Sequence, residues 1–206
     1  MKKDTLKILL SIFLVGGVLG VFTINRSFFT KNTSNQQDIT KETWPKKIDE
    51  LSIPELGITL NLNNEWFAHK PMNNEEEIYS IAISNHNVIN LPLGLDDETG
   101  IGIFISNRNE YSCYSSKEYP QLISLGIGEK YENDCRIFIK TDEKTISSHK
   151  THVFDEINTS KIESNGKSKL YLLETNKETI NITILSKNKN LTFEDADSLI
   201  ESIIFN

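Results

Sequence analysis

The sequence predicts an α+β domain in which one or two helices pack on an antiparallel β-sheet. Apolar and polar residues alternate in several short segments after residue 50, which is the pattern of half-buried strands. The connections between these segments are short, and short connections favour antiparallel neighbours. The last apolar residues recur at helical spacing instead, so a helix is expected at the C-terminus.

The chain begins with an apolar segment that follows basic residues. Seventeen residues from Ile8 to Ile24 carry no charge, and three lysines precede them. This pattern predicts a signal-anchor transmembrane helix at 8–25, after a basic cytoplasmic N-terminus at 1–7. A cleaved signal peptide is the alternative, although the segment lacks an A-x-A-like cleavage site. The prediction is a single-pass protein of the cell membrane, with the lipid bilayer as a partner and its C-terminal domain extracytoplasmic.

The rest of the chain divides into a linker and one domain. Residues 26–44 are mostly polar and are predicted to form a flexible linker. Residues 45–206 fit a single extracytoplasmic domain, and they hold 16 basic and 26 acidic residues, a net charge of −10. Because an acidic surface repels phosphate groups, no nucleic-acid partner is predicted.

Strands are predicted at 51–62, 78–84, 100–106, 135–140, 169–174 and 179–185. In the first of them a Pro-Glu-Leu-Gly turn precedes Ile58, Leu60 and Leu62, which alternate with polar residues. Residues 175–178 have the composition of a hairpin turn between the last two strands. No internal repeat is visible.

Two helices are predicted. Thr192 is a good N-cap residue, and it is followed by Ala196, Leu199, Ile200 and Ile203 at helical spacing. The second helix lies between 115 and 125, where Pro120 must sit near its start or break it.

Two stretches resemble known sequences. The segment Ile53–Ile58 with Asn64-Glu65-Trp66, and the C-terminal segment Ala196–Phe205, resemble the two ends of PsbP-like domains. That resemblance implies an α/β/α sandwich around an antiparallel sheet. It implies no particular activity, because fold analogy does not establish function.

Cys113 and Cys135 are the only cysteines in the chain. In an oxidising compartment an even pair predicts a disulfide bond, which would stabilise the domain by roughly 3 kcal/mol on chain-entropy grounds. Two reduced cysteines are the alternative. A redox-active pair is not expected without C-x-x-C spacing.

Candidate metal ligands are sparse. His149 and His152 form an H-x-x-H motif that on a helix could bind zinc together with Asp155 or Glu156. The local sequence favours surface histidines in a loop instead. The acidic runs 75–77 and 96–98 are interpreted as solvated turns, with a weak cation site near Asp96 as the alternative. No metal site and no cofactor are predicted.

No catalytic residues are predicted either, because the chain contains no nucleophile elbow, dinucleotide-binding glycine motif or Walker loop. The function predicted from the sequence is a non-enzymatic accessory module that binds a protein or an envelope component. The alternatives are a cell-envelope hydrolase whose site is assembled from scattered residues, and a small-ligand or cation-binding module.

Overall fold

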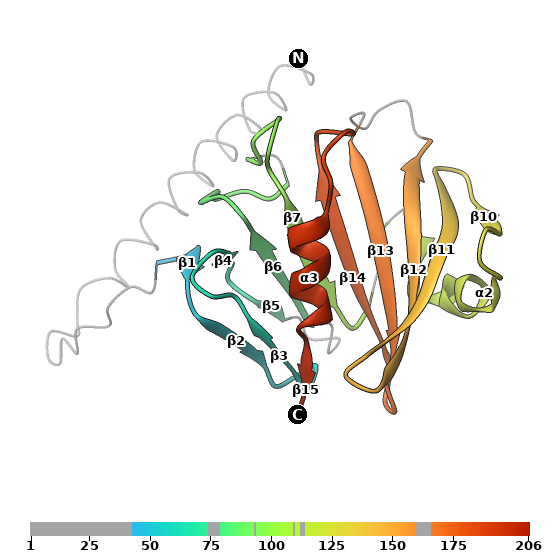
Figure 1. Cartoon of the computed structure of the whole chain (residues 1–206), viewed down its shortest axis with the longest axis horizontal. Helices are drawn as coiled ribbons and strands as arrows, with labels where there is room; N and C mark the ends of the chain where they lie inside the picture. The colour runs from blue at the N-terminus through green and yellow to red at the C-terminus, as the bar shows by residue number, and fades with distance from the viewer. Residues whose placement is uncertain (1–42, 74–78, 93, 109, 112–113, 160–165) are drawn as a thin grey trace, which may run out of the picture. The chain divides into compact units, whose positions relative to one another are not determined.

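The computed structural model describes residues 43–206, except 74–78, 93, 109, 112–113 and 160–165 (Figure 1). Most of this region is antiparallel β-structure arranged as one large sheet and two small ones. The large sheet contains, in spatial order, β1 (Lys46–Lys47), β4 (Phe67–Ala68), β6 (Tyr79–Ser84), β7 (Gly102–Ser106), β14 (Thr179–Ser186), β13 (Lys167–Glu174), β12 (His149–Asn158), β11 (Arg136–Ile146) and β10 (Lys130–Glu132), while β5 (Met72–Asn73) also pairs with β6.

The smaller elements lie around this sheet. A three-stranded sheet is formed by β2 (Glu50–Ile53), β3 (Ile58–Asn61) and β15 (Ile204–Phe205), and a two-stranded one by β8 (Glu110–Tyr111) and β9 (Tyr114–Ser115). The described helices are the 3₁₀ turn η1 (Ser116–Glu118), α2 (Tyr119–Ser124) and α3 (Glu194–Glu201). Pro120 lies in the first turn of α2, where its missing N–H costs no helical hydrogen bond.

Both faces of the large sheet bury apolar side chains. On what we call the inner face, Ile103, Ile105 and Ile182 pack with β2, β3 and α3 in the main core. Figure 1 shows α3 in front of the sheet beside β14, and Asp197 of α3 accepts hydrogen bonds from Lys169 and Tyr171 of β13. On the outer face α2 covers a second, smaller core that consists of Tyr119, Leu122, Phe138, Phe154, Leu170 and Leu172. The period-two alternation of β-strands explains how Phe154 can enter one core and Val153 the other.

These observations correct the predicted fold class. The predicted α+β arrangement, and the α/β/α sandwich with it, is wrong because α2 has six residues and α3 eight, too few to form helical layers. Part of the inner-face cover is β-structure instead, contributed by β2 and β3. Residues 45–206 are therefore mainly an antiparallel β domain. The predictions found β6, β7, β13, β14 and both helices, whereas β12 was predicted as a loop and β11 only at its start.

The predicted membrane anchor is also corrected. Within the part of the chain that the structure describes, no helix is long and apolar enough to cross a bilayer. The segment 8–25 lies outside the described residues. The structure gives no support to a single-pass location in the cell membrane or to the lipid bilayer as a partner.

Candidate functional site

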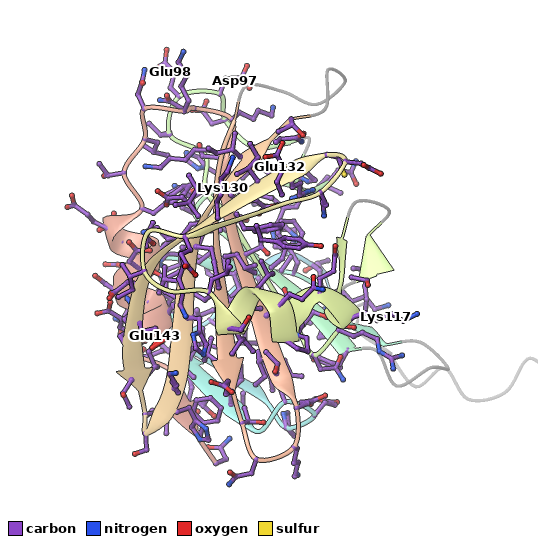
Figure 2. All side chains as sticks on the ribbon, turned by 90° about the vertical axis from the view of Figure 1, so that its right-hand side faces the viewer. Asp97, Glu98, Lys117, Lys130, Glu132 and Glu143 are labelled. Atoms are coloured by element: carbon purple, nitrogen blue, oxygen red, sulfur yellow. The ribbon has the colours of Figure 1, made fainter. Side chains whose placement is uncertain are left out.

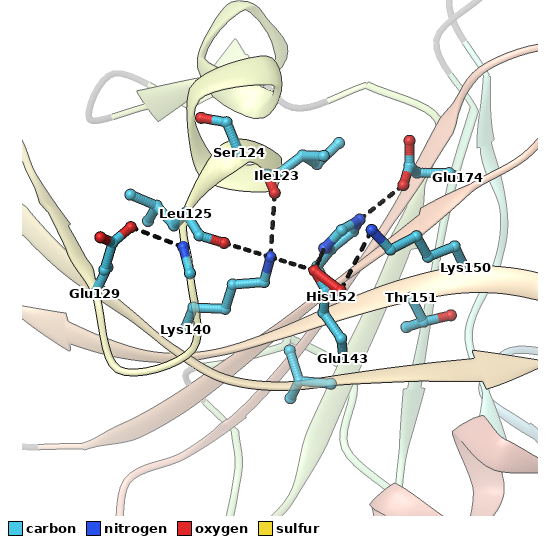
Figure 3. Close-up of polar contacts among 12 residues, drawn as sticks. Ile123, Ser124, Leu125, Glu129, Lys140, Glu143, Lys150, Thr151, His152 and Glu174 are labelled. Atoms are coloured by element: carbon cyan, nitrogen blue, oxygen red, sulfur yellow. Dashed lines mark hydrogen bonds and ion pairs between the residues drawn. The ribbon is translucent and has the colours of Figure 1, made fainter.

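A group of ionisable side chains on the outer face lies where β11, β12 and β13 meet the end of α2 (Figure 3). We call it the His152 cluster, and it consists of Lys140, Glu143, Lys150, His152 and Glu174. A register shift at Thr141 explains its composition. Lys140 pairs with Phe154 and Glu143 with His152, so two residues three positions apart face the same side of the sheet.

His152 is the centre of this cluster and has no solvent-exposed surface. Its Nε2 donates to Glu174 Oε1 at 2.7 Å. Its Nδ1 lies 3.3 Å from Glu143 Oε1, which is ion-pair distance but outside hydrogen-bond geometry. With a carboxylate facing each ring nitrogen and no exposed surface of its own, His152 is poorly placed to act as a base or to ligate a metal.

Lys140 is 1% exposed, and its Nζ donates three hydrogen bonds. Two of them go to the carbonyl oxygens of Ile123, at 3.1 Å, and Leu125, at 2.6 Å, where α2 ends. The third goes to Glu143 Oε1 at 2.7 Å. The ammonium group thus uses all three donors to bind the end of α2 to the sheet, which leaves it unsuitable as a nucleophile.

Glu143 closes the cluster toward solvent, with its side chain 34% exposed. Hydrogen bonds from Lys140 and Lys150 lower the pKa of its carboxyl group from an ordinary 4.5 to about 2. Glu143 is therefore an anion throughout the physiological pH range. The cluster as a whole acts as a polar clamp that joins three strands and α2.

The structure separates the two histidines of the predicted H-x-x-H motif. They lie on β12 rather than on a helix or in a loop, and residues three apart on a strand face opposite sides. His149 faces the inner side, where its ring lies 3.9 Å from the Phe205 ring and its Nδ1 is 3.1 Å from the Glu174 carbonyl oxygen. No group of three metal-binding side chains occurs among the described residues, so the zinc alternative receives no support.

Of the other candidate ligands, Glu156 and Asp96 have structural partners. Asp155 is exposed, whereas Glu156 is buried, pairs with Arg136 and accepts a hydrogen bond from Ser168 at 2.7 Å. Asp96 accepts hydrogen bonds from the backbone N–H groups of Glu98 and Thr99, and these bonds lower the pKa of its carboxyl group. Its role in the loop is that of a turn residue.

Two predictions fall outside what the structure describes. The acidic run 75–77 lies in an omitted segment. Cys113 does as well, so the described residues contain no complete disulfide bond and the pairing of Cys113 with Cys135 stays a prediction.

Beside the cluster, strand β11 has an edge that no described strand covers beyond Lys140, which we call the free edge of β11. β10 and the turn before it accompany β11 only as far as Lys140, whose N–H donates to Glu129 and whose carbonyl accepts from Gly128. From Asp142 to Ile146, β11 pairs with β12 on one side, and no described strand pairs with it on the other. In Figure 2 the half of β11 that carries Glu143 forms the outer border of the sheet.

Along a strand the backbone N–H and C=O groups of successive residues point to opposite sides, and this alternation identifies which of them are unpaired at the free edge. Lys140 directs its N–H and C=O toward β10, and Thr141 is the extra residue at the register shift. Beyond it Asp142, Lys144 and Ile146 bond to β12, so the N–H and C=O groups of Glu143 and Thr145 point outward. Glu143 and Thr145 are both exposed. Two donors and two acceptors are thus presented to solvent in strand geometry.

Comparison with known proteins provides no identification. No family model matches the chain, and no curated protein matches it. One similar solved structure is a crystal structure from Bacteroides thetaiotaomicron VPI-5482, with a TM-score of 0.44 and 13% sequence identity, covering 78% of this chain and 49% of that one. The chain thus spans about half the length of that protein, and a likeness at this level carries no argument about function. The resemblance to PsbP-like domains stays untested.

Proposed function

We propose that this protein is a non-enzymatic protein-binding module that accepts an extended segment of a partner as an added strand along β11. The observation that carries the proposal is the free edge from Asp142 to Ile146, which pairs with β12 on one side only within the described region. Unpaired N–H and C=O groups at a sheet edge are a template for strand addition, and main-chain hydrogen bonds then supply much of the affinity.

The edge is well supported for this role. β12 backs it along its whole length, and the Ser147-Ser148 turn, with φ of 48° and 73°, closes a tight hairpin at its end. The His152 cluster holds Glu143 from the outer face through Lys140 and Lys150. A template fixed in advance loses little conformational entropy when the partner strand adds to it.

The two alternative functions have weaker support. A hydrolase needs a reachable base or nucleophile, whereas His152 and Lys140 are buried and bonded. A hollow of about 220 Å³ lies between α3 and the turn after β3, lined by residues that include Trp66 and Asp195. It is smaller than the 300–1,000 Å³ that is roughly usual for small-ligand sites.

The test is selection of the full-length protein against a displayed library of random linear peptides, followed by affinity measurement by fluorescence anisotropy. Thr145→Pro removes one outward N–H and should weaken every selected peptide by about tenfold or more, because a ladder hydrogen bond is lost and the proline ring obstructs the edge. The melting temperature should change little, because that N–H makes no bond to β12.

Thr145→Val is the matched control, since it keeps the backbone N–H and nearly the same side-chain shape. It should bind as the wild type does. Equal binding by the wild type and Thr145→Pro, or a library that yields no binding peptide, would show that β11 is not the binding edge.

A further inference from the structure

We infer that the partner segment is basic, with a lysine or arginine beside Asp142, and that Asp142 determines this specificity. The inference rests on the proposed function, because it names the kind of segment that the free edge of β11 accepts. It goes further by assigning the choice of partner to one side chain.

The charges along the edge show why Asp142 is distinctive. Glu143 is bonded to Lys140 and Lys150. Lys144 Nζ lies 2.6 Å from Glu201 Oε1. Asp142 is exposed, adds to the effect of burial in raising the pKa of the Tyr171 hydroxyl group, and makes no hydrogen bond or ion pair with another described residue. Of the three charged side chains on this edge, it is therefore the one whose charge is left for a partner.

The geometry directs that charge toward an added strand. Asp142 and Lys144 are opposite Val153 and Thr151, so both project on the inner face. In a strand added beside β11, residues on the same face would come within about 4.5–5.5 Å of Asp142, measured between Cβ atoms of directly opposite residues. A lysine or arginine at that position meets an uncompensated carboxylate, whereas an acidic residue is repelled by it.

The charge of the whole domain acts in the same direction. Residues 45–206 carry a net charge of −10, which attracts a basic segment during approach and repels an acidic one. The same charge disfavours a second copy of this chain as the occupant. If two copies paired edge to edge, Glu143 of one copy would bond to Thr145 of the other. The two Lys144 side chains would then lie directly opposite each other, and like charges in that position destabilise a strand pair.

The experiment uses peptides selected with the wild-type protein. Each peptide is also synthesised in variants in which one basic residue at a time is replaced by glutamine or by glutamate. Asp142→Asn should weaken the basic peptides about two- to fivefold, as expected for an exposed ion pair. Asp142→Lys should weaken them further and should restore binding when one particular basic residue is changed to glutamate. The effect should shrink in 1 M salt, where the screening length is about 3 Å.

Asp155→Lys is the matched control, because it makes the same change in net charge at an exposed position of β12 that is not on the edge. If it weakens the basic peptides as much as Asp142→Lys does, the attraction is general and Asp142 determines nothing. Selected peptides without a basic bias would overturn the inference as well. In both cases the proposed function survives if Thr145→Pro still weakens binding by about tenfold or more, and it fails if Thr145→Pro binds the peptides as the wild type does.

Discussion

Replacement of Lys140 by methionine tests whether the clamp holds α2 on the sheet. Methionine is similar in length and fills the same space, so the change removes the ammonium group without opening a cavity. The carbonyl groups of Ile123 and Leu125 lose their bonds to Nζ, and Glu143 loses its shortest cationic contact. Because Lys140 is 1% exposed, water cannot easily replace these bonds.

The expected magnitude follows from these contacts. A buried acceptor left without a partner costs about 1–3 kcal/mol, and two carbonyl groups are affected. Methionine no longer buries an ammonium charge, and this gain offsets part of the cost. We therefore expect the free energy of unfolding to fall by about 3 kcal/mol, as for other broken buried pairs. For a domain of this size each kcal/mol corresponds to about 2–4 °C, so the melting temperature should fall by about 6–12 °C.

Thermal unfolding followed by circular dichroism, with the full-length protein at neutral pH, measures this effect. Lys150→Met is the control, because Lys150 is 57% exposed and contacts Glu143 alone in the cluster, at 3.3 Å. It should shift the melting temperature by less than about 2 °C. A Lys140→Met protein that melts within 2 °C of the wild type would refute the clamp, since the two carbonyl groups would then have found other partners at no cost.

Two further variants test other contacts. Tyr171→Phe removes a fully buried hydroxyl that donates to Asp197 at 2.6 Å, so the free energy of unfolding should fall by about 1.5–3 kcal/mol; an unchanged denaturant midpoint would mean that this bond does not hold α3. Glu143→Gln tests pH dependence: since folding lowers the pKa of Glu143 from 4.5 to about 2, its stabilising effect is complete above pH 4.5 and is lost as the pH falls toward 2. The difference in melting temperature between the wild type and Glu143→Gln should therefore narrow from pH 6 to pH 2.5, and a constant difference would contradict the assigned pKa.

Segments with a clear alternating pattern were predicted correctly. The alternation of Ile101, Ile103 and Ile105 marks β7, and residues 175–178 form the turn between β13 and β14, where Thr175 accepts and donates hydrogen bonds. The last helix was predicted because its apolar face packs against the main core. In each case the residues that define the element are close together in the sequence.

The β11–β12 hairpin was predicted only in part, and the reason is physical. From Thr141 to Lys150 the one aliphatic residue is Ile146, because this end of β11 is an exposed edge and buries little. Such a strand has almost no hydrophobic alternation. Its conformation comes from its hydrogen bonds to β12. Because this hairpin was not predicted, His149 and His152 were placed in a loop instead of on β12.

The sequence by itself determined the local elements, the acidic net charge of the domain and the absence of a recognisable catalytic motif, since each depends on residue types and short spacings. It did not determine the fold class. Whether strands or helices cover the core depends on how β2, β3 and the two short helices pack on the large sheet. The His152 cluster and the free edge of β11 were decided by tertiary structure alone. Glu174 lies 22 positions from His152, and the shift at Thr141 reverses which side chains and backbone groups face outward, so only the assembled sheet brings them together.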